Sequence, residues 1–360
     1  MIVKEVTNSS DKAYFVISED ADDLFSLRRI IEGGDYVIAD STRVIKQVGE
    51  YARPDKGERI KVRVSIRVEN ISFDQSIDRL RIAGIITASS NELVSKGTHH
   101  SLTLRVGDSI TIDKGRKWSN LEINILRKSG DTSGFILIAI DTQEAAIAKL
   151  SGTHLEIIPN IYSGKSGKRY PQAVKRDSKT ESFFEDIART ISGLLIVEKD
   201  RFRAIIFGPG ETKRRFYNFL STTTDIDKNV FLVLEGIDVA GEDGIYVFLR
   251  STAMKEVMKT SKLASVSSIV DEIMSLVSKG ENKFAIGIHE VQNSASIKAI
   301  SNLVLSDSIF RTAAESEVIR LLNLLEGQGA KVYAVDSSTD IGMRVSALGG
   351  VVALLRYAIR

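Results

Sequence analysis

Residues 202–220 read FRAIIFGPGETKRRFYNFL, and this stretch combines three structural signals. The run from Ala204 to Phe207 is apolar and typical of a buried strand. Gly208-Pro209-Gly210 then favours a sharp turn, because glycine accepts positive φ angles and proline fixes its own φ. Apolar residues follow at helical spacing, at Phe216, Phe219 and Leu220. We therefore predict a strand, a tight turn and a helix in direct succession.

A strand that turns this tightly into a helix should bring backbone amides, Thr212 and Lys213 to one exposed point. Such a point can hold a phosphate group, because the amides at a helix N-terminus attract anions. It can equally dock a partner protein. The residues of the turn leave both alternatives open.

The chain has 360 residues, 43% apolar and 27% charged, so we expect a folded protein of two or three domains. It contains no cysteine, which excludes disulfides and thiolate metal sites and fits a reducing cytosol. Its start lacks the apolar core of a signal peptide, and no run reaches the roughly 18 apolar residues of a membrane span. The net charge is +2, so affinity for anions must come from local patches.

Residues 1–130 are predicted to form a small β-barrel after one short helix. The helix covers residues 22–31, where apolar residues recur at helical spacing. Apolar and polar residues then alternate over residues 36–39, 60–68, 80–86, 102–106 and 109–112. Short alternating strands with turns between them indicate a barrel.

Residues 134–258 are predicted to form an α/β domain. Residues 135–140 are continuously apolar, as in a strand buried on both faces. Ser178 and Glu181 form a capping-box pattern that should open a helix. The strand, turn and helix of residues 202–220 follow, and the alternation of strand and helix indicates the α/β class.

Residues 262–360 are predicted to form a second α/β domain. The expected helices cover residues 264–278, 294–302 and 312–325, and the expected strands cover residues 283–288, 303–305, 331–335 and 351–355. The predicted fold class is therefore multidomain α+β and α/β, with a β-barrel first and two α/β domains after it.

A basic segment lies inside the central domain. Gly164-Lys165-Ser166 resembles the end of a phosphate-binding loop, but Pro159 stands where that loop requires glycine, and Pro171 argues against a following helix. Five cations and no acid occur between Tyr162 and Arg176, at Lys165, Lys168, Arg169, Lys175 and Arg176. We favour contact with a nucleic-acid backbone over a merely solvated loop.

A second basic region belongs to the first domain, in or beside the loop between two predicted strands. Its cations are Arg43, Lys46, Arg53, Lys56, Arg59, Lys61 and Arg63. Some of them must be outward-facing strand residues with no further role. A small barrel with cationic loops is a common RNA-binding arrangement.

One acidic group is a candidate for metal binding. Glu19, Asp20, Asp22 and Asp23 could hold a divalent cation. The alternative, which we favour, is that these acids begin a helix and face its macrodipole.

Several motifs together resemble the Pelota family of archaeal and eukaryotic ribosome-rescue proteins, paralogues of the class-1 peptide release factor. The matching stretches are the Gly208-Pro209-Gly210 turn with Lys213 and Phe216, residues 97–102, 287–291 and 305–310, and the ending at residues 353–357. Each motif alone is weak, but their order and spacing extend over nearly the whole chain. The short tail and the lack of long insertions resemble the archaeal members.

The resemblance implies an Sm-like first domain, a release-factor-like central domain and a last domain similar to an RNA-binding ribosomal protein. It implies binding in the A site of stalled ribosomes, delivery by a GTPase related to elongation factor 1-alpha, and subunit splitting by an ABC-type ATPase. The first-domain loop with Arg43, Lys46, Arg53 and Lys56 would face the mRNA channel. The turn at Pro209, Gly210 and Lys213 would face the GTPase, so the nucleotide would belong to the partner and not to this chain.

One departure from the release factor bears on function. Peptide release requires a Gly-Gly-Gln sequence, which does not occur in this chain, and the loop at Lys165, Lys168 and Arg169 lies in the corresponding region. The resemblance therefore implies a cytoplasmic, monomeric rescue and mRNA-surveillance factor for no-go decay that does not hydrolyse peptidyl-tRNA. The alternative is an endoribonuclease in the first domain that requires a divalent metal, with Asp22 and Asp23 as its weak catalytic candidates.

Overall fold

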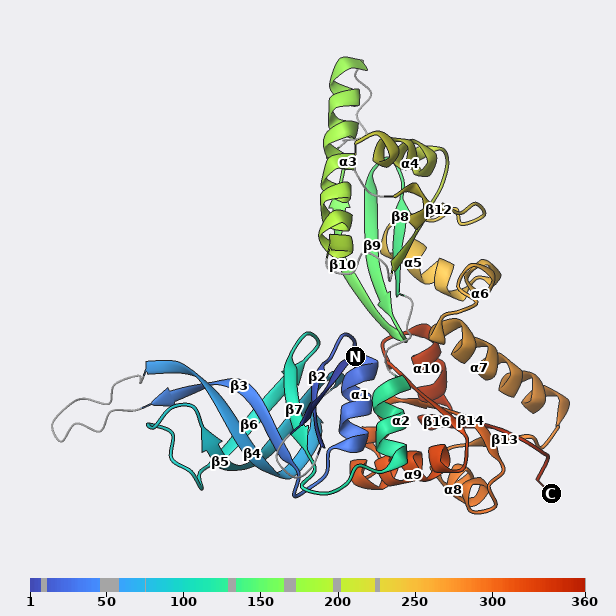
Figure 1. The fold of residues 1–360 in the computed structure, drawn as a ribbon. Coiled ribbons are helices and arrows are strands. Elements are labelled where there is room, and N and C mark those ends of the chain that lie inside the picture. Colours follow the sequence, from blue (N-terminus) through green and yellow to red (C-terminus); the bar gives the residue numbers. More distant parts are fainter. Residues whose placement is uncertain are drawn as a thin grey trace. The chain divides into compact units, whose positions relative to one another are not determined.

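Three sheets of seven, five and four strands form the framework of the chain (Figure 1). The structure, a computed structural model, describes residues 1–7, 12–45, 58–74, 76–128, 134–164, 173–196, 202–223 and 227–359. Contacts divide the chain into two compact units. The first holds residues 1–131, 292–301 and 307–334, and the second holds residues 132–291, 302–306 and 335–360.

The seven-stranded sheet lies in the first unit, and all its neighbouring strands are antiparallel. Its order is β1-β2-β7-β3-β4-β5-β6. The strands are β1 (Ile2–Thr7), β2 (Lys12–Ile17), β3 (Tyr36–Ile45), β4 (Glu58–Asp74), β5 (Ser76–Ser89), β6 (His99–Arg105) and β7 (Ser109–Asp113), and the helices of this segment are α1 (Ala21–Ile30) and α2 (Asn120–Lys128).

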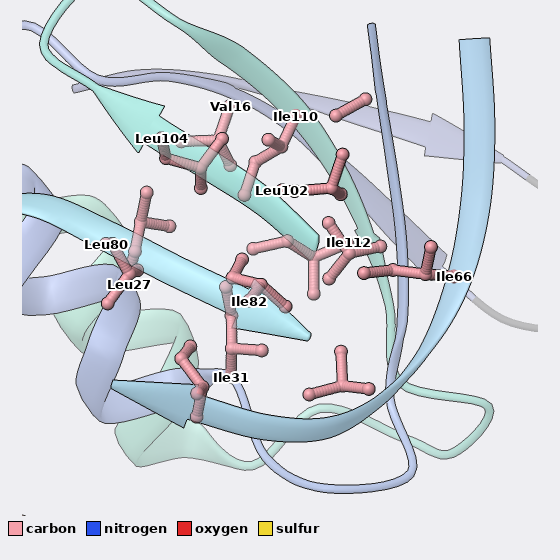
Figure 2. Close-up of a cluster of buried hydrophobic side chains, with 14 of the residues drawn as sticks. Val16, Leu27, Ile31, Ile66, Leu80, Ile82, Leu102, Leu104, Ile110 and Ile112 are labelled. Atoms are coloured by element: carbon pink, nitrogen blue, oxygen red, sulfur yellow. The ribbon is translucent and has the colours of Figure 1, made fainter. Parts of the chain in front are cut away.

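One hydrophobic core is shared by strands from both halves of this sheet. Val16 of β2, Ile82 of β5 and Leu102 of β6 point into the same cluster, together with Leu27 of α1 (Figure 2). Strong curvature of the sheet explains how its two halves meet, and bulges in the β4–β5 pairing supply bends. The alternating pattern that predicted these strands therefore corresponds to one buried and one exposed face.

Lys114 is fully buried in this unit and is surrounded by oxygen atoms. Its Nζ lies 2.8 Å from Asp35 Oδ2 and 3.0 Å from Glu122 Oε1, and it donates to the carbonyl of Ile30. The ammonium also lies 5.6 Å from the centroid of the Trp118 ring. A buried charge is tolerated only when it is paired and hydrogen-bonded, so this network specifies how α1 and α2 meet the sheet.

The carboxyl group of Glu122 makes the stability of this network dependent on pH. Burial alone would raise the pKa of Glu122, but hydrogen bonds from Arg116 and Ser119 outweigh it and lower that pKa to about 2. A carboxylate with a lowered pKa stabilises the fold above its ordinary value of 4.5, and this contribution is lost as the pH falls through about 2. We expect the urea midpoint to fall between pH 4.5 and pH 2 more steeply for the natural protein than for Glu122→Gln.

The fluorescence of Trp118, the single tryptophan, reports this transition. Glu92→Gln, at an exposed position, is the matched control and should keep the natural slope. Burial raises the pKa of Asp35, so this carboxyl group changes stability with pH in the opposite direction. Asp35 is present in all three proteins and therefore does not affect their comparison. Equal slopes for the natural protein and Glu122→Gln would contradict the role assigned to this carboxylate.

The five-stranded sheet lies in the second unit, in the order β10-β9-β8-β11-β12. β11 runs parallel to both of its neighbours, β8 and β12. The elements are β8 (Gly134–Ile140), β9 (Glu144–Ser151), β10 (His154–Tyr162), α3 (Ala173–Ile196), β11 (Phe202–Phe207), α4 (Thr212–Thr223), η1 (Lys228–Val230), β12 (Phe231–Val233), α5 (Gly241–Arg250) and α6 (Thr252–Val257).

Helices cover both faces of this sheet (Figure 1). On one face, Phe184 of α3 and Phe216 of α4 pack against Ile138 and Ile206 of the strands. On the other face, Phe207 of β11 stacks on Phe248 of α5, with 4.8 Å between the ring centroids. Every residue of β8 is buried, as its continuous apolar sequence predicted, and the α/β fold class is confirmed.

The four-stranded sheet has the order β13-β16-β14-β15. The remaining elements are α7 (Lys262–Lys279), β13 (Phe284–Ile286), α8 (Ile288–Ser296), β14 (Ile300–Ser306), η2 (Asp307–Arg311), α9 (Glu315–Gly327), β15 (Lys331–Val335), α10 (Asp340–Ala347) and β16 (Val351–Leu355). In the part of the chain that the structure describes, no helix is both long and apolar enough to cross a membrane.

In this last segment, one sequence prediction is wrong and one helix was missed. The helix expected at residues 294–302 is α8, which begins at Ile288 directly after Gly287, a residue with φ 79°. The helix α10 was not predicted, because it is short and contains Gly342. That glycine is required there, since a Cβ at this position would lie 1.9 Å from the carbonyl oxygen of Asp336.

Candidate nucleic-acid and partner interfaces

The corner between β11 and α4 is fixed by two glycines with positive φ. Gly208 has φ 137°, and a Cβ on it would lie 2.1 Å from the carbonyl oxygen of Ile140. Gly210 has φ 63° but faces open space. Pro209 between them is half-buried, whereas Gly210 is exposed. The corner is therefore rigid at Gly208, where the backbone approaches β8, and accessible at Gly210.

Lys213 belongs to the inside of this corner. Its Nζ donates to the carbonyl oxygens of Gly208 and Gly210, both at 2.9 Å, and lies 2.9 Å from Glu235 Oε2. Only 4% of Lys213 and 8% of Thr212 are exposed. The expectation that these two side chains stand exposed at the turn is wrong, because the carbonyl groups of the tight turn need a buried donor.

Glu235 is the residue of this corner that sequence reasoning missed. It lies in the loop after β12, binds Lys213 and accepts from Arg214 Nε at 3.0 Å. The hydrogen bond from Lys213 and the nearby charge of Arg214 lower its pKa. Its only sequence signal is a Leu234-Glu235-Gly236 loop after an apolar run, and that signal does not identify a partner. The exposed charges of the corner and of the first turn of α4 are Glu211, Arg214, Arg215 and Glu235.

Replacing Lys213 with methionine should destabilise the second unit by about 1–3 kcal/mol, because the carbonyls of Gly208 and Gly210 lose their donor. Urea unfolding followed by far-ultraviolet circular dichroism measures the change. Arg214→Met is the control, since Arg214 is exposed and binds the same carboxylate; we expect a change below about 0.5 kcal/mol. Equal effects of the two substitutions would contradict a structural role for Lys213.

The cations of the first domain fall into two positions. Arg43 is half-buried and donates from Nη1 to Thr98 Oγ1 at 3.1 Å, whereas Arg59 is exposed on the strand opposite. His100 lies beside Arg43. Burial of the imidazole is the main cause that lowers the pKa of His100, and the positive charge of Arg43 lowers it further. Lys46, Arg53 and Lys56 lie outside the described residues. Of the seven cations in this predicted region, the structure therefore places four, which are Arg43 and the exposed β4 residues Arg59, Lys61 and Arg63.

The central basic segment is partly described. Lys165, Lys168 and Arg169 lie outside the described residues. Lys175 and Arg176 lie in the first turn of α3, which begins at Ala173 and not at the capping box of Ser178. The prediction of irregular structure at these two positions is wrong, because Pro171 precedes the helix and does not interrupt it. Cations in a first turn oppose the helix dipole, so helix stability does not explain them.

The acidic group at the start of α1 is engaged in local structure. Asp20 caps the helix, with its side chain accepting from Asp23 N at 2.9 Å. Asp23 Oδ2 accepts from Glu19 N at 2.8 Å and lies 2.6 Å from the amino nitrogen of Met1. Asp22 and Asp23, the weak catalytic candidates, are both buried. These contacts favour the interpretation of the group as the acids of a helix start.

Family models match the three parts of the chain in succession. The description Pelota N-terminal domain applies to residues 1–130, eRF1 domain 2 to residues 134–260, and eRF1 domain 3 to residues 263–359. This succession defines a three-domain protein of the release-factor class.

Similar proteins show to which family within this class the chain belongs. The chain is 51% identical to a protein pelota homolog of Nitrosopumilus maritimus over 352 residues, which make up 98% of each chain. The chain therefore belongs to the Pelota family. Its fold is similar to that of the Thermoplasma acidophilum Pelota protein, with a TM-score of 0.62 at 24% identity over the full length of both chains. A structure described as ribosome-bound archaeal Pelota and ABCE1 matches with a TM-score of 0.46 at 28% identity, again over both full chains.

Proposed function

We propose that this chain recognises stalled ribosomes in the A site and promotes their dissociation and the surveillance of their mRNA, without hydrolysing peptidyl-tRNA. The observation that carries the proposal is the release-factor architecture in a chain without Gly-Gly-Gln. Family membership supports the ribosome as the target, because an archaeal Pelota is described in a ribosome-bound state. We place its action in the cytoplasm, as a single copy for each ribosome.

The missing motif explains why the chain should occupy the site without releasing the peptide. Release requires a group that positions water at the ester bond, which Gly-Gly-Gln supplies in release factors. Here the corresponding loop carries Lys165, Lys168 and Arg169. An ammonium or guanidinium group suits the phosphates of ribosomal RNA and does not reproduce the geometry of a glutamine amide.

The partners follow from the same reasoning. ABCE1 accompanies the ribosome-bound archaeal relative, which supports an ABC-type ATPase as a partner of this chain. A GTPase related to elongation factor 1-alpha is the proposed carrier, with Pro209 and Gly210 at the accessible side of the rigid corner. Lys213 would act by holding that corner, since its Nζ is already bonded to the turn. We propose no nucleotide-binding site for this chain itself. We propose a bound divalent metal only for the alternative function, the nuclease activity.

Co-sedimentation with ribosomes that carry an empty A site tests the proposal. The natural protein with the GTPase should sediment with the ribosomes, and charge reversal at Lys165, Lys168 and Arg169 should reduce the bound fraction at least about tenfold. The control reverses Lys4, Lys117 and Arg127, which are exposed in the first domain and change the net charge equally. No binding of the natural protein would refute the proposed function, and equal binding of both variants would refute the role of the basic loop.

A further inference from the structure

The outer face of strands β4, β5 and β6 carries a band of cations that begins with Arg59, Lys61 and Arg63 of the predicted basic region and extends beyond it. Along β4 the inward residues Val62, Val64 and Ile66 are buried in the core. Four of the alternate, outward positions are basic and exposed, and further cations lie on β5 and β6. Its members are Arg59, Lys61, Arg63 and Arg67 of β4, Arg79 and Arg81 of β5, and Arg105 of β6.

The pairing register places the cations of β5 and β6 side by side. Arg79 lies directly opposite Arg105, and Arg81 lies opposite Thr103 in the next outward row. Like charges opposite each other on a sheet destabilise it, so the stability of the strands does not explain this pair. Residues two apart on one strand are about 7 Å apart, and neighbouring strands are about 5 Å apart. Arg67 lies opposite Ile85, so Arg79 lies about 20 Å further along the sheet. Lys61, Arg63 and Arg67 therefore form one group of positive charge, and Arg79, Arg81 and Arg105 form another.

Few carboxylates among the described residues neutralise these two groups of cations. Asp40 of β3 lies 3.5 Å from Arg63, but both side chains are more than half exposed, so the pair is weak. Glu69, at the bulge, lies 3.1 Å from His99. Arg81 donates to the neutral hydroxyl of Ser101 at 2.9 Å. No ion pair is described for Lys61, Arg67, Arg79 or Arg105 within the described part of the chain.

We propose that this face binds a segment of RNA backbone, separately from the β3–β4 loop. Phosphate groups recur along a strand of RNA, so one extended segment can contact both groups of cations at once. Hydroxyl-bearing neighbours such as Ser101 and Thr103 add donors for phosphate and ribose oxygens.

Charge and composition favour RNA over a protein partner. Protein interfaces typically have an apolar core, whereas nucleic-acid interfaces are polar and strongly basic. On this face Tyr36 of β3 is the one large apolar side chain found exposed among the described residues, and it stands opposite Arg67. A tyrosine beside an arginine is suited to stack on a base or pack on a ribose. That the RNA is ribosomal follows from the proposed function, and this part of the inference rests on that proposal.

The test compares matched triple variants of the full chain on a labelled, protein-free RNA hairpin and on ribosomes with an empty A site. Lys61→Glu with Arg67→Glu and Arg79→Glu removes three cations that hold no described partner. The control, with glutamate at Lys4, Lys117 and Arg127, changes the charge equally elsewhere in the first domain. Glutamine at the three face positions gives a milder variant in which only the positive charges are removed.

We expect the glutamate face variant to bind the hairpin at least about tenfold more weakly than the control, with the glutamine variant between them. For the glutamate face variant, the slope of log K against the logarithm of the salt concentration should be shallower by about 2–3. The reason is that about one counterion is released for each phosphate contact. Unchanged thermal melting would show that all variants fold.

Equal hairpin affinity of the face variant and the control would overturn the inference. So would a loss seen on ribosomes but not on the hairpin, because it would indicate an acidic protein partner. The proposed function fails in a different way, namely if the natural protein does not bind ribosomes at all. In that case the hairpin measurement still decides whether this face binds RNA.

Discussion

Replacing Lys114 with methionine is expected to destabilise the first unit by about 3–5 kcal/mol, close to the whole stability of a small domain. The substitution keeps the volume of the side chain but leaves the buried carboxyl group of Asp35 without its cation. Glu122 keeps a partner in Arg116, so Asp35 should account for most of the loss. The urea midpoint, followed by the fluorescence of Trp118, measures the change.

The control is Lys117→Met, which removes an exposed lysine three residues away and should change stability by less than about 0.5 kcal/mol. The double variant with Lys114→Met and Asp35→Asn should recover part of the loss, because an amide is less costly to bury than a carboxylate. A single variant as stable as the control would show that the buried network does not hold this unit together.

Replacing Gly208 with alanine is expected to destabilise the second unit by about 2–6 kcal/mol. The positive φ strains any residue with a Cβ, and the new Cβ would lie 2.1 Å from the carbonyl oxygen of Ile140, so the corner must move. Gly210→Ala is the matched control, since the same chemical change there meets open space and costs about 1–2 kcal/mol for the φ angle alone.

Two readouts separate the effects of these alanines on the corner. Urea unfolding followed by circular dichroism gives the stability, and co-sedimentation with the carrier GTPase gives the proposed partner contact. Gly208→Ala should affect both, whereas Gly210→Ala should leave the fold nearly intact. If the two alanines cost the same stability, the close approach of Gly208 to β8 would not be the feature that fixes the corner.

Local periodicity was sufficient to predict much of the fold. The apolar run at residues 135–140 became the buried strand β8, and residues 202–220 became β11, the glycine corner and α4. Predictions were poorer where a local signal competed with a longer helix. Ser178 and Glu181 match a capping box, yet they lie inside α3, which begins at Ala173.

The candidate sites were harder to predict because their contacts join distant positions. The burial of Lys213 depends on Glu235, which follows a different strand, and no spacing rule connects the two residues. The pairing of Arg79 with Arg105 depends on the register of β5 and β6, which a single strand does not reveal. The outward cations of β4 were visible in the sequence as an alternating pattern, but alternation alone did not distinguish a solvated face from a binding surface.

The central claim is that the chain occupies the A site of a stalled ribosome and leaves the peptidyl ester intact. Ribosomes that carry a labelled peptidyl-tRNA in the P site and an empty A site test this directly, when incubated with the protein, the GTPase, the ATPase and their nucleotides. We predict that the subunits separate while the labelled peptide stays attached to its tRNA. Free peptide at the level produced by a release factor, or subunits that stay joined, would contradict the account.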